Sequence, residues 1–519
     1  MTLPIDAFSD ELVTDPERCA RESSDVYSRG VPASALLRPR DVERCAYLVG
    51  EATRAGYTVI ARGGGLSYTG GYLPQATGAV LLDTSRLDRI VEISAEDLYI
   101  TVEAGVSWKQ IDEALQPLGL RLPFFGTFSG AQATVGGGLS NGALFFGTAR
   151  YGTAADAVLG LEVALADGQI VKTGQLAFRA ASKPFYRTCG PDLTGLFLHE
   201  SGAFGVKLRA TFRLIRRPEF IGHVSFVFDG IDRAASGLSE VARSGAAEDA
   251  YVFDPESTRK NLSSAGLGRD LAMLGKVMRA ERSWWRGLVA ALRIALAGRR
   301  FLPQEAYSLH VTCAARSAAA LDADLAACRQ AALARGGREI PNSIPRAVRA
   351  QPFPPLEAVL GPDGDRWAAL NAKVAHSDAM TIIRASATLL DPYRERMRAE
   401  GVWMSHLLIA IGTHAFSFEP VFHWHDEWLP VHEKHAAAAL KARGNPPAAR
   451  PAAAALVHEL RGRLVELFAA QGAASNQLGK TYPYLSVLHP STAAVVQGIK
   501  QVLDPTGRIN PGALELGGR

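Results

Sequence analysis

The sequence predicts an α+β protein of two or more domains, and three observations lead to this class. The chain has 519 residues, more than one hydrophobic core ordinarily holds. Two glycine-rich stretches, near residues 65 and 138, interrupt an N-terminal half in which short apolar runs alternate with helical patterns. From about residue 220, strand patterns followed by helical patterns recur, as expected of a sheet with helices on one face.

The composition is that of a globular protein and gives no strong signal for a macromolecular partner. Hydrophobic residues make up 47% and charged residues 21%, and the net charge of +4 is too small to indicate nucleic acid. The five cysteines contain no CxxC pair, which favours buried thiols in a reducing compartment over disulfides or a zinc site. The cysteines are Cys19, Cys45, Cys189, Cys313 and Cys328.

The N-terminal stretch "MTLPIDAFSDELVTDPERC" is acidic where a signal peptide would be basic and then apolar. No apolar run approaches the ~20 residues that a membrane span needs. We therefore expect a cytoplasmic protein, with peripheral contact to the inner face of the membrane as an alternative.

The N-terminal half reads as helix and then strand over residues 39–60, with strands within 78–93 and 99–106. Ser107 is expected to cap a helix that ends at Gly119. Residues 157–174 form two apolar runs joined at Asp167-Gly168, which predicts a hairpin.

The second half predicts a strand followed by a helix at 222–245 and again at 305–337. Two further strands are expected at 405–412 and 414–425, and the alanine- and proline-rich residues 435–456 should connect two helices on the surface. The chain closes with a helix and the segment "LDPTGRINPG", whose prolines and glycine suggest an ordered, packed tail.

Glycine permits positive φ and close approach of the backbone, and consecutive free N–H groups form concave sites for anions. The stretch "RGGGLSYTGG" (62–71) and the tract from Gly126 to Gly152 both meet this description. A pyrophosphate fits such loops, although either loop alone could be a surface turn.

Four motifs in fixed order strengthen the first interpretation: "RGGGLSYTGG", "TVGGGLSNGALFFGTARYGTAADAVLGLEVALADGQIVKTG", "ESGAFGVKLRATFRL" and "LDPTGRINPG". Together they resemble the flavoenzyme family typified by p-cresol methylhydroxylase (PCMH) and vanillyl-alcohol oxidase, whose FAD-binding fold the glycolate and D-lactate dehydrogenases share. The resemblance covers residues 36–219 well, the last sixty residues moderately and the middle weakly. Neither a GxGxxG after the first strand nor a GK[ST] ending is present, so Rossmann and P-loop enzymes fit poorly.

The resemblance implies a PCMH-type FAD-binding domain of two α+β subdomains (1–219). It further implies an α+β cap or substrate domain with an antiparallel sheet (220–460), and a C-terminal segment that returns to the FAD domain (461–519). A Cβ at Gly64 or Gly65 is expected to collide with the diphosphate. The implied cofactor-binding residues are Arg62, Gly63, Gly64, Gly65, Leu66, Ser67, Tyr68, Thr69, Gly70, Thr134, Val135, Gly136, Gly137, Gly138, Ser140, Asn141, Gly142, Tyr151, Gly152, Gly202, Ala203, Gly205, Val206 and Asn510.

Members of the family with a histidyl-bound flavin carry His where this chain has Leu66, and no cysteine lies in the second loop. We therefore expect dissociable FAD.

The first catalytic candidates lie on "HAFSFEPVFHWHDEW". In an extended chain Glu419, His423 and His425 would share one face and could act as base, as orienting group or as metal ligands. His414 is a further candidate. Because the "GDGNLH" and "EHGIG" contexts of the metal-binding family branch are missing, we expect no metal. Packing or surface histidines are the plain alternative.

Arg384, in the apolar run "TIIRASATLL", could clamp a substrate carboxylate or pair with a buried carboxylate. Arg346 and Arg349 are weaker choices for the same role. Tyr482 and Tyr484, in "GKTYPYL", lie where phenol oxidases of the family place substrate-facing groups, but the tyrosine–arginine pair of those enzymes is not reproduced.

Residues 276–300 form a basic, tryptophan-containing amphipathic pattern, which suits a helix at a membrane interface. The alternative is an ordinary helix of the cap domain. The sequence is also compatible with a homodimer.

The sequence thus predicts an FAD-dependent oxidoreductase that takes a hydride from a small hydroxyl-bearing substrate, such as a 2-hydroxy acid. The acceptor is oxygen, quinone or cytochrome. The alternatives are oxidation of para-substituted phenols or benzylic alcohols, and a flavin-binding interaction module without turnover.

Overall fold

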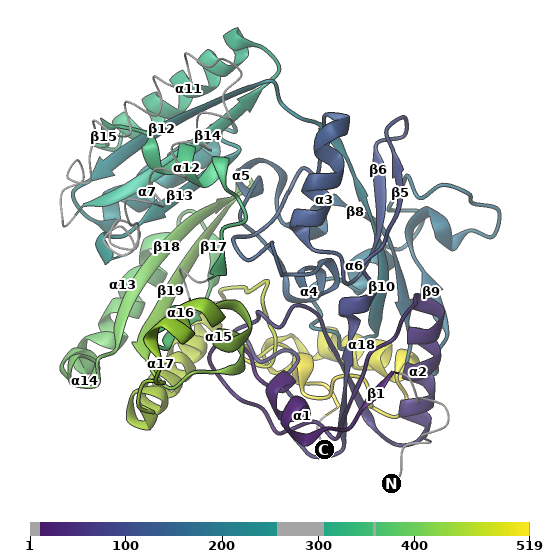
Figure 1. The fold of residues 1–519 in the computed structure, drawn as a ribbon. Coiled ribbons are helices and arrows are strands. Elements are labelled where there is room, and N and C mark those ends of the chain that lie inside the picture. Colours follow the sequence, from purple (N-terminus) through teal and green to yellow (C-terminus); the bar gives the residue numbers. More distant parts are fainter. Residues whose placement is uncertain (1–10, 257–305, 357–359, 518–519) are drawn as a thin grey trace.

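The computed structural model describes residues 11–256, 306–356 and 360–517. Two bodies of sheet and helix lie against each other, one formed mainly by the N-terminal half and one by the middle of the chain (Figure 1). The amphipathic pattern at 276–300 lies outside the described residues. Within those residues, no helix has the length and apolar character needed to cross a membrane.

The first sheet positions the first glycine loop. Its order is β1-β2-β4-β3, and β2, β4 and β3 run parallel because helical or looped connections separate them. β3 ends directly at the loop. The elements of this part are β1 (Leu12–Val13), α1 (Pro16–Glu22), β2 (Ala35–Leu37), α2 (Val42–Arg54), β3 (Thr58–Arg62) and β4 (Ala79–Asp83).

The second sheet has five antiparallel strands in the order β5-β6-β10-β8-β9. Ser107 caps helix α3 (Trp108–Leu115) through a capping box with Gln110, and Gly119 ends the helical turn at φ 63°, as the sequence predicts. The hairpin between β8 and β9 turns at Gly168, whose φ is 86°. The strands are β5 (Ile90–Ser94), β6 (Tyr99–Glu103), β8 (Val158–Ala164), β9 (Ile170–Lys172) and β10 (Val206–Arg213).

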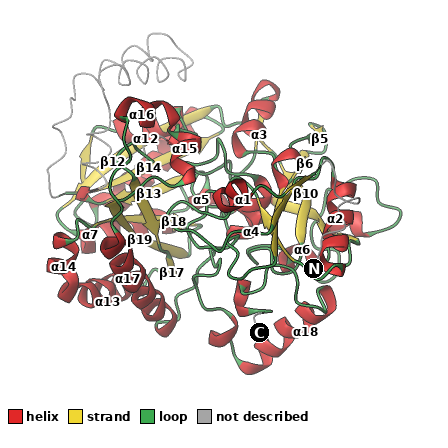
Figure 2. Cartoon of the chain, turned by 60° about the horizontal axis from the view of Figure 1, so that its bottom comes forward, coloured by secondary structure: helices red, strands yellow, loops and turns green. Residues whose placement is uncertain are grey.

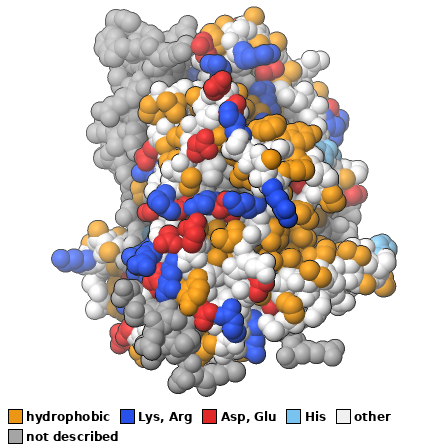
Figure 3. All heavy atoms as spheres, turned by 90° about the vertical axis from the view of Figure 1, so that its right-hand side faces the viewer, with side chains coloured by type: hydrophobic (Ala, Val, Ile, Leu, Met, Phe, Trp, Pro, Cys, Tyr) orange, Lys and Arg blue, Asp and Glu red, His pale blue; other side chains and the backbone are white. Residues whose placement is uncertain are grey.

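Short helices fill the space between this sheet and the middle of the chain (Figures 1 and 2). They are α4 (Val135–Asn141), α5 (Thr148–Tyr151) and α6 (Leu193–Leu196). A two-stranded ladder pairs β7 (Leu120–Arg121) with β11 (Ile215–Arg216). Acidic and basic side chains lie next to one another on the outer face of this half of the molecule (Figure 3).

The middle of the chain forms one large antiparallel sheet, the cap sheet, in the order β15-β12-β14-β13-β18-β19-β16, with β17 also paired to β19. Helices α7, α11 and α13 cover one face, whereas α5 contacts β13 and β18. The strands are β12 (Phe220–Phe228), β13 (Asp249–Phe253), β14 (Tyr307–Ala315), β15 (Arg338–Ile340), β16 (Asp365–Ala369), β17 (Ala372–Ala375), β18 (Trp403–Ile411) and β19 (Ala415–His425). The helices are α7 (Ile231–Arg243), α11 (Ala318–Leu333), α12 (Ser343–Ala350), α13 (Ala379–Leu390) and α14 (Arg394–Ala399).

The C-terminal part connects both bodies. α17 reaches the cap sheet, where Phe468 packs edge-on against Phe418. The tail then lies beside β3: Val59 N–H donates to Arg508 O and Asn510 N–H donates to Val59 O, both at 2.9 Å. The helices here are α15 (Pro430–His435), α16 (Ala437–Arg443), α17 (Pro451–Ala470) and α18 (Pro490–Leu503).

Candidate active site

The two glycine-rich loops contact each other directly. A Cβ at Gly63 would clash with the Thr134 hydroxyl, and one at Gly64 would clash with the Gln132 carbonyl. Gly65 has φ 74°, and a Cβ there would meet the Arg62 guanidinium. This corrects the expected reason for Gly64 and Gly65, because their Cβ positions point into the protein itself. Gly64 allows the two loops to close on each other, and Gly65 leaves room for the Arg62 side chain of its own loop.

The first loop presents a row of backbone donors. The N–H groups of residues 63–67 donate to no described residue. Consecutive N–H groups of this kind bind anions, because their partial positive charges converge without a side chain between them. The second loop is arranged differently: Gly136 N–H donates to Ala104 O, and Gly138 N–H donates to Thr134 O, both at 2.8 Å.

Side chains join the loops to each other. Thr69 is fully buried, and its Oγ1 lies 2.9 Å from Asn141 Oδ1 and 3.1 Å from Ser67 Oγ. Thr134 caps α4 by accepting from Gly137 N–H. The loops are therefore one unit.

A third segment and the C-terminal tail complete this unit. Ser201 N–H donates to Ser140 O at 2.9 Å. Asn510 Nδ2 donates to Gly71 O at 2.8 Å and to Ser201 O at 2.5 Å. Asn510 Oδ1 and His199 Nε2 are among the buried polar atoms that have no hydrogen-bond partner in the described residues. Because buried polar atoms are normally paired, both point to a polar group that binds here.

These features fit FAD. The amide row of residues 63–67 suits the diphosphate, and the unpaired Asn510 Oδ1 can accept from a ring N–H. Several of the predicted cofactor-binding residues pack within the protein and so shape the site without pointing a side chain into it. The side chains of Val135, Ala203 and Val206 are buried in apolar clusters, and Cβ atoms at Gly136, Gly138 and Gly205 would meet Ala104, Trp108 and Val163.

Three other predicted positions are held within the protein. Arg62 pairs with Glu22 at 2.6 Å, and Leu66 packs against the apolar cluster that includes Tyr68. Gly152 has φ 80°, and a Cβ there would meet Asp156. The Gly202 Cβ position is 3.7 Å from Asn510 Nδ2, so this glycine does face the tail.

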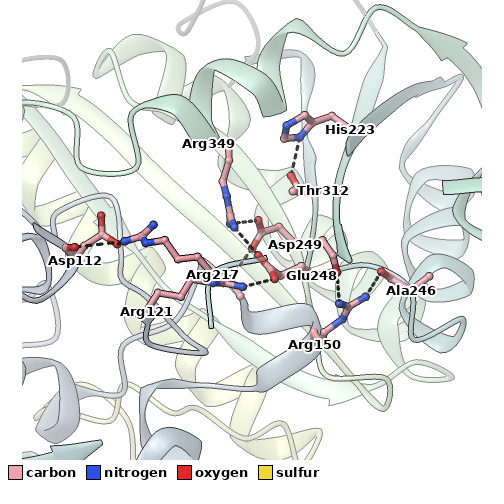
Figure 4. Close-up of polar contacts among 12 residues, drawn as sticks. Asp112, Arg121, Arg150, Arg217, His223, Ala246, Glu248, Asp249, Thr312 and Arg349 are labelled. Atoms are coloured by element: carbon pink, nitrogen blue, oxygen red, sulfur yellow. Dashed lines mark hydrogen bonds and ion pairs between the residues drawn. The ribbon is translucent and has the colours of Figure 1, made fainter. Parts of the chain in front are cut away.

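A buried ionic network joins the two bodies (Figure 4), and its Arg121 guanidinium lies 5.8 Å from the centre of the Tyr151 ring. Arg121 pairs with Glu248 at 2.5 Å, and Arg349 pairs with Glu248 at 2.6 Å and with Asp249 at 3.2 Å. Burial would raise the pKa of Glu248, but Arg121 and Arg349 hold it at about 2. Arg349, a weaker candidate from sequence for a carboxylate clamp, is thus largely buried and already paired with two carboxylates of the protein.

The structure divides the catalytic candidates into exposed and buried residues. Arg384 is a correction: it lies on the outer side of α13 and pairs with Asp232, with side chains 68% and 56% exposed, so it is too far into solvent to clamp a substrate. His414 is exposed at the turn between β18 and β19, and the side chain of His425 is 47% exposed. These two are therefore not in the site either.

His423 is buried, accepts or donates through Nε2 to Ser405 Oγ at 2.8 Å, and stacks on Trp403. Its place on β19 is four residues from Glu419, on the same face, as the strand periodicity predicts.

Tyr482 is buried and bonded to Asn371, whereas the backbone of Tyr484 bonds to the C-terminal tail. The hydroxyl of Tyr482 accepts from Asn371 N–H at 2.6 Å. Tyr68 donates to Gln477 Oε1, which also accepts from Asn371 Nδ2 at 2.9 Å. Tyr484 is only partly buried, and its N–H donates to Glu515.

Sequence reasoning missed Lys373 and His199. Lys373 lies on β17 opposite Ser417, and its ammonium donates to Ser417 Oγ at 2.8 Å. The pKa of His199 is lowered to about 4, mainly by burial, with smaller contributions in the same direction from the charges of Lys207 and Lys373 and an opposing one from Asp156. A positive φ of 58° at His199 is the structural mark of this position, but the sequence carries no signal for it. Among the described residues, no three His, Cys, Asp or Glu side chains cluster as metal ligands.

Residues 33–174 match the family model of an FAD binding domain, so FAD is the cofactor to which this part of the chain corresponds. Among curated proteins, the chain is 30% identical over 273 residues to a mitochondrial D-lactate dehydrogenase [cytochrome] of Kluyveromyces lactis, which is 50% of this chain and 46% of that protein. It is 30% identical over 207 residues to the glycolate oxidase subunit GlcD of Bacillus subtilis, 40% of this chain and 42% of that protein. The matched segments thus span less than half of either relative.

The fold is shared over nearly the whole chain. A 4-ethylphenol oxidase from Gulosibacter chungangensis aligns with TM-score 0.70 and 19% identity, covering 98% of this chain and 94% of that one. A p-cresol methylhydroxylase aligns with TM-score 0.70 and 17% identity over the same shares. The predicted α+β, PCMH-type fold is confirmed.

Proposed function

We propose that this protein is an FAD-dependent oxidoreductase that takes a hydride from the C–H of a small hydroxyl-bearing substrate, with 2-hydroxy acids as the leading class. The observation that carries this proposal is the row of N–H donors at residues 63–67, which is closed against the second glycine loop. When bound, FAD supplies the two-electron acceptor for the hydride. The protein supplies its binding site and the groups over the reacting carbon.

The two curated relatives support the substrate class, because lactate and glycolate, which appear in their names, are 2-hydroxy acids. A cation is needed to hold such a carboxylate. Lys373 is a cation on β17 that lies opposite Ser417 of β19, beside the segment that joins both loops.

Oxidation of para-substituted phenols is the second candidate. It is favoured by the pair of buried tyrosines, Tyr68 and Tyr482, whose charges influence each other. Burial raises the pKa of both hydroxyls, and Arg461 is nearby but donates to the carbonyls of Ala369 and Tyr68. This arrangement gives a phenolate little stabilisation, so the hydroxy acid class ranks first.

The FAD is proposed to be dissociable, since position 66 is a leucine instead of a histidine and the second loop contains no cysteine. An absorption spectrum of the purified protein, before and after acid precipitation, tests both points. Flavin absorbance in the supernatant is expected, whereas a colourless protein that takes up no FAD contradicts the proposal.

Substrate class is tested by anaerobic bleaching of the bound flavin with D-lactate, glycolate and 4-hydroxybenzyl alcohol. Bleaching by the two acids supports the leading class, and bleaching by the alcohol alone supports the second. If no substrate of either class bleaches a flavin that dithionite reduces, the interaction module without turnover is favoured.

A further inference from the structure

One face of the cap sheet brings a cation and a carboxylate together. Lys373 pairs with Ser417 across β17 and β19, so both side chains project from the same face. Glu419 follows Ser417 by two residues and shares that face, because side chains alternate along a strand. This face differs from that of Phe416 and Phe418, of which Phe418 packs against α17.

The segment at 474–477 fixes this face next to the glycine loops. Lys373 N–H donates to Ala474 O at 2.7 Å, and Ala474 N–H donates to Lys373 O at 3.0 Å. Two residues further on, Asn476 Nδ2 donates to Gly142 O in the second loop. Gln477 accepts from Tyr68 of the first loop. The backbone of Lys373 is therefore tied to both loops through one short segment.

The carboxylate and the ammonium are incompletely satisfied within the protein. Glu419 is 6% exposed, and its carboxylate accepts no hydrogen bond from any described residue. The Lys373 ammonium has three donors but a single acceptor among these residues, Ser417 Oγ. Burying two charged groups with so few hydrogen bonds costs free energy, which indicates a role outside stability.

The electrostatic environment is tuned to neutral pH. Burial raises the pKa of Glu419 to about 7, opposed by the positive charge of Lys373. Burial lowers the pKa of Lys373 to about 8, opposed by Glu419. The charge of Glu419 raises the pKa of Tyr68 and of Tyr482, and the charge of Lys373 lowers the pKa of His199. Perturbed groups that converge in this way are typical of catalytic sites.

We propose that Lys373 and Glu419 are catalytic residues of the oxidation: Lys373 binds the carboxylate of a 2-hydroxy acid and Glu419 takes the proton from its hydroxyl. This inference rests on the proposed function. The substrate O–H bond breaks as its proton moves to Glu419, the C=O bond forms, and the hydride with its two electrons leaves the carbon for the oxidised flavin. The product is a 2-oxo acid.

The test separates binding from proton transfer by using oxalate, a dianion without a C–H bond, as a binding probe. Oxalate affinity is measured from the perturbation of the flavin spectrum, and flavin reduction by D-lactate and glycolate is measured by anaerobic stopped flow. Lys373→Gln is expected to weaken oxalate binding at least ~10-fold, and Lys373→Arg should restore most of it. Glu419→Gln should bind oxalate within ~3-fold of wild type but slow flavin reduction ~100-fold or more.

Arg384→Gln is the matched control, because it removes an exposed charge from the same body of the protein, and it should change neither quantity. Flavin content and thermal midpoint report whether each variant folds. Oxalate binding by Lys373→Gln that equals wild type, or reduction of Glu419→Gln at the wild-type rate, overturns the proposal.

A wild-type protein without flavin defeats the proposed function itself. Reduction of wild type by 4-hydroxybenzyl alcohol but not by either acid overturns the role of Lys373 and leaves the FAD oxidoreductase standing. The failures are therefore distinguishable.

Discussion

Thr69 and Asn141 form a hydrogen bond between the two glycine-rich loops, with 2.9 Å between Oγ1 and Oδ1. Thr69 also accepts through its backbone carbonyl from Lys480 N–H at 2.8 Å and from the Thr481 hydroxyl. A buried threonine at the first loop thus links both loops to the C-terminal part.

The first prediction concerns this link. Thr69→Val keeps the volume of the side chain but removes the hydroxyl, which leaves Asn141 without this hydrogen-bond partner. The loss of such a buried hydrogen bond costs about 1–3 kcal/mol of free energy. We expect the dissociation constant for FAD to rise ~5- to 100-fold in fluorescence titrations of deflavinated protein. Thr69→Ser retains the hydroxyl and should bind nearly as wild type. Equal affinity of all three proteins would show that the link does not position the loops.

The second prediction concerns glycines that permit close packing. A Cβ at Gly64 would clash with the backbone carbonyl of Gln132, which cannot rotate away as a side chain can. Gly64→Ala is therefore expected to yield protein with little bound flavin. Gly462, inside α17, has no atom within 4 Å of its Cβ position. Gly462→Ala should be neutral or stabilise the protein by up to about 1 kcal/mol, measured by urea unfolding and flavin content.

The third prediction concerns the ionic network between the two bodies. Glu248→Ala leaves Arg121 and Arg349 buried without their shared carboxylate, which is expected to lower the free energy of unfolding by about 3–5 kcal/mol. Asp232→Ala breaks the exposed pair with Arg384 and should cost at most about 1 kcal/mol. Denaturant titrations of both variants measure these free energies of unfolding. Equal decreases in the two variants would show that the buried network stabilises the protein no more than the exposed pair does.

The fourth prediction is the pH dependence of hydroxy acid oxidation. Glu419 acts as a base only when deprotonated, so activity rises with pH through its pKa of about 7. Lys373 binds a carboxylate only when protonated, so activity falls as pH rises through its pKa of about 8. We expect kcat/KM to peak between these values, and Glu419→Gln to lose the rising limb of its residual activity. A flat profile in wild type from pH 6 to 9 would contradict both assignments.

Local signals allowed much of the fold to be predicted. The Ser107 cap, the Gly168 turn and the strand at 58–62 depend on neighbours in sequence, so their patterns were sufficient. The helical periodicity of α13 would have placed Arg384 on the exposed face, although the residue stands in an apolar run. The buried residues of this helix include Ala379, Ile382, Ile383 and Ser386.

The catalytic pair could be only half predicted. Strand alternation on β19 marked Glu419, but its partner Lys373 comes from another strand, whose position depends on pairing with Ser417 and Ala474. Likewise, the Gly64 clash depends on Gln132 in the second loop. Such long-range contacts leave no periodic pattern in the sequence, so the residues that form them can be identified only from the folded structure.

The position of Asn510 has a consequence for biosynthesis. It binds the carbonyl of Gly71, which emerges from the ribosome 439 residues earlier, and Lys500 secures that turn by donating to Ile509 O and Ala203 O. A growing polypeptide therefore carries both glycine loops long before the residue that joins them. The hydrogen bonds from Asn510 to Gly71 and Ser201 can therefore form only after residue 510 has been synthesised, and a chain that ends before it lacks them.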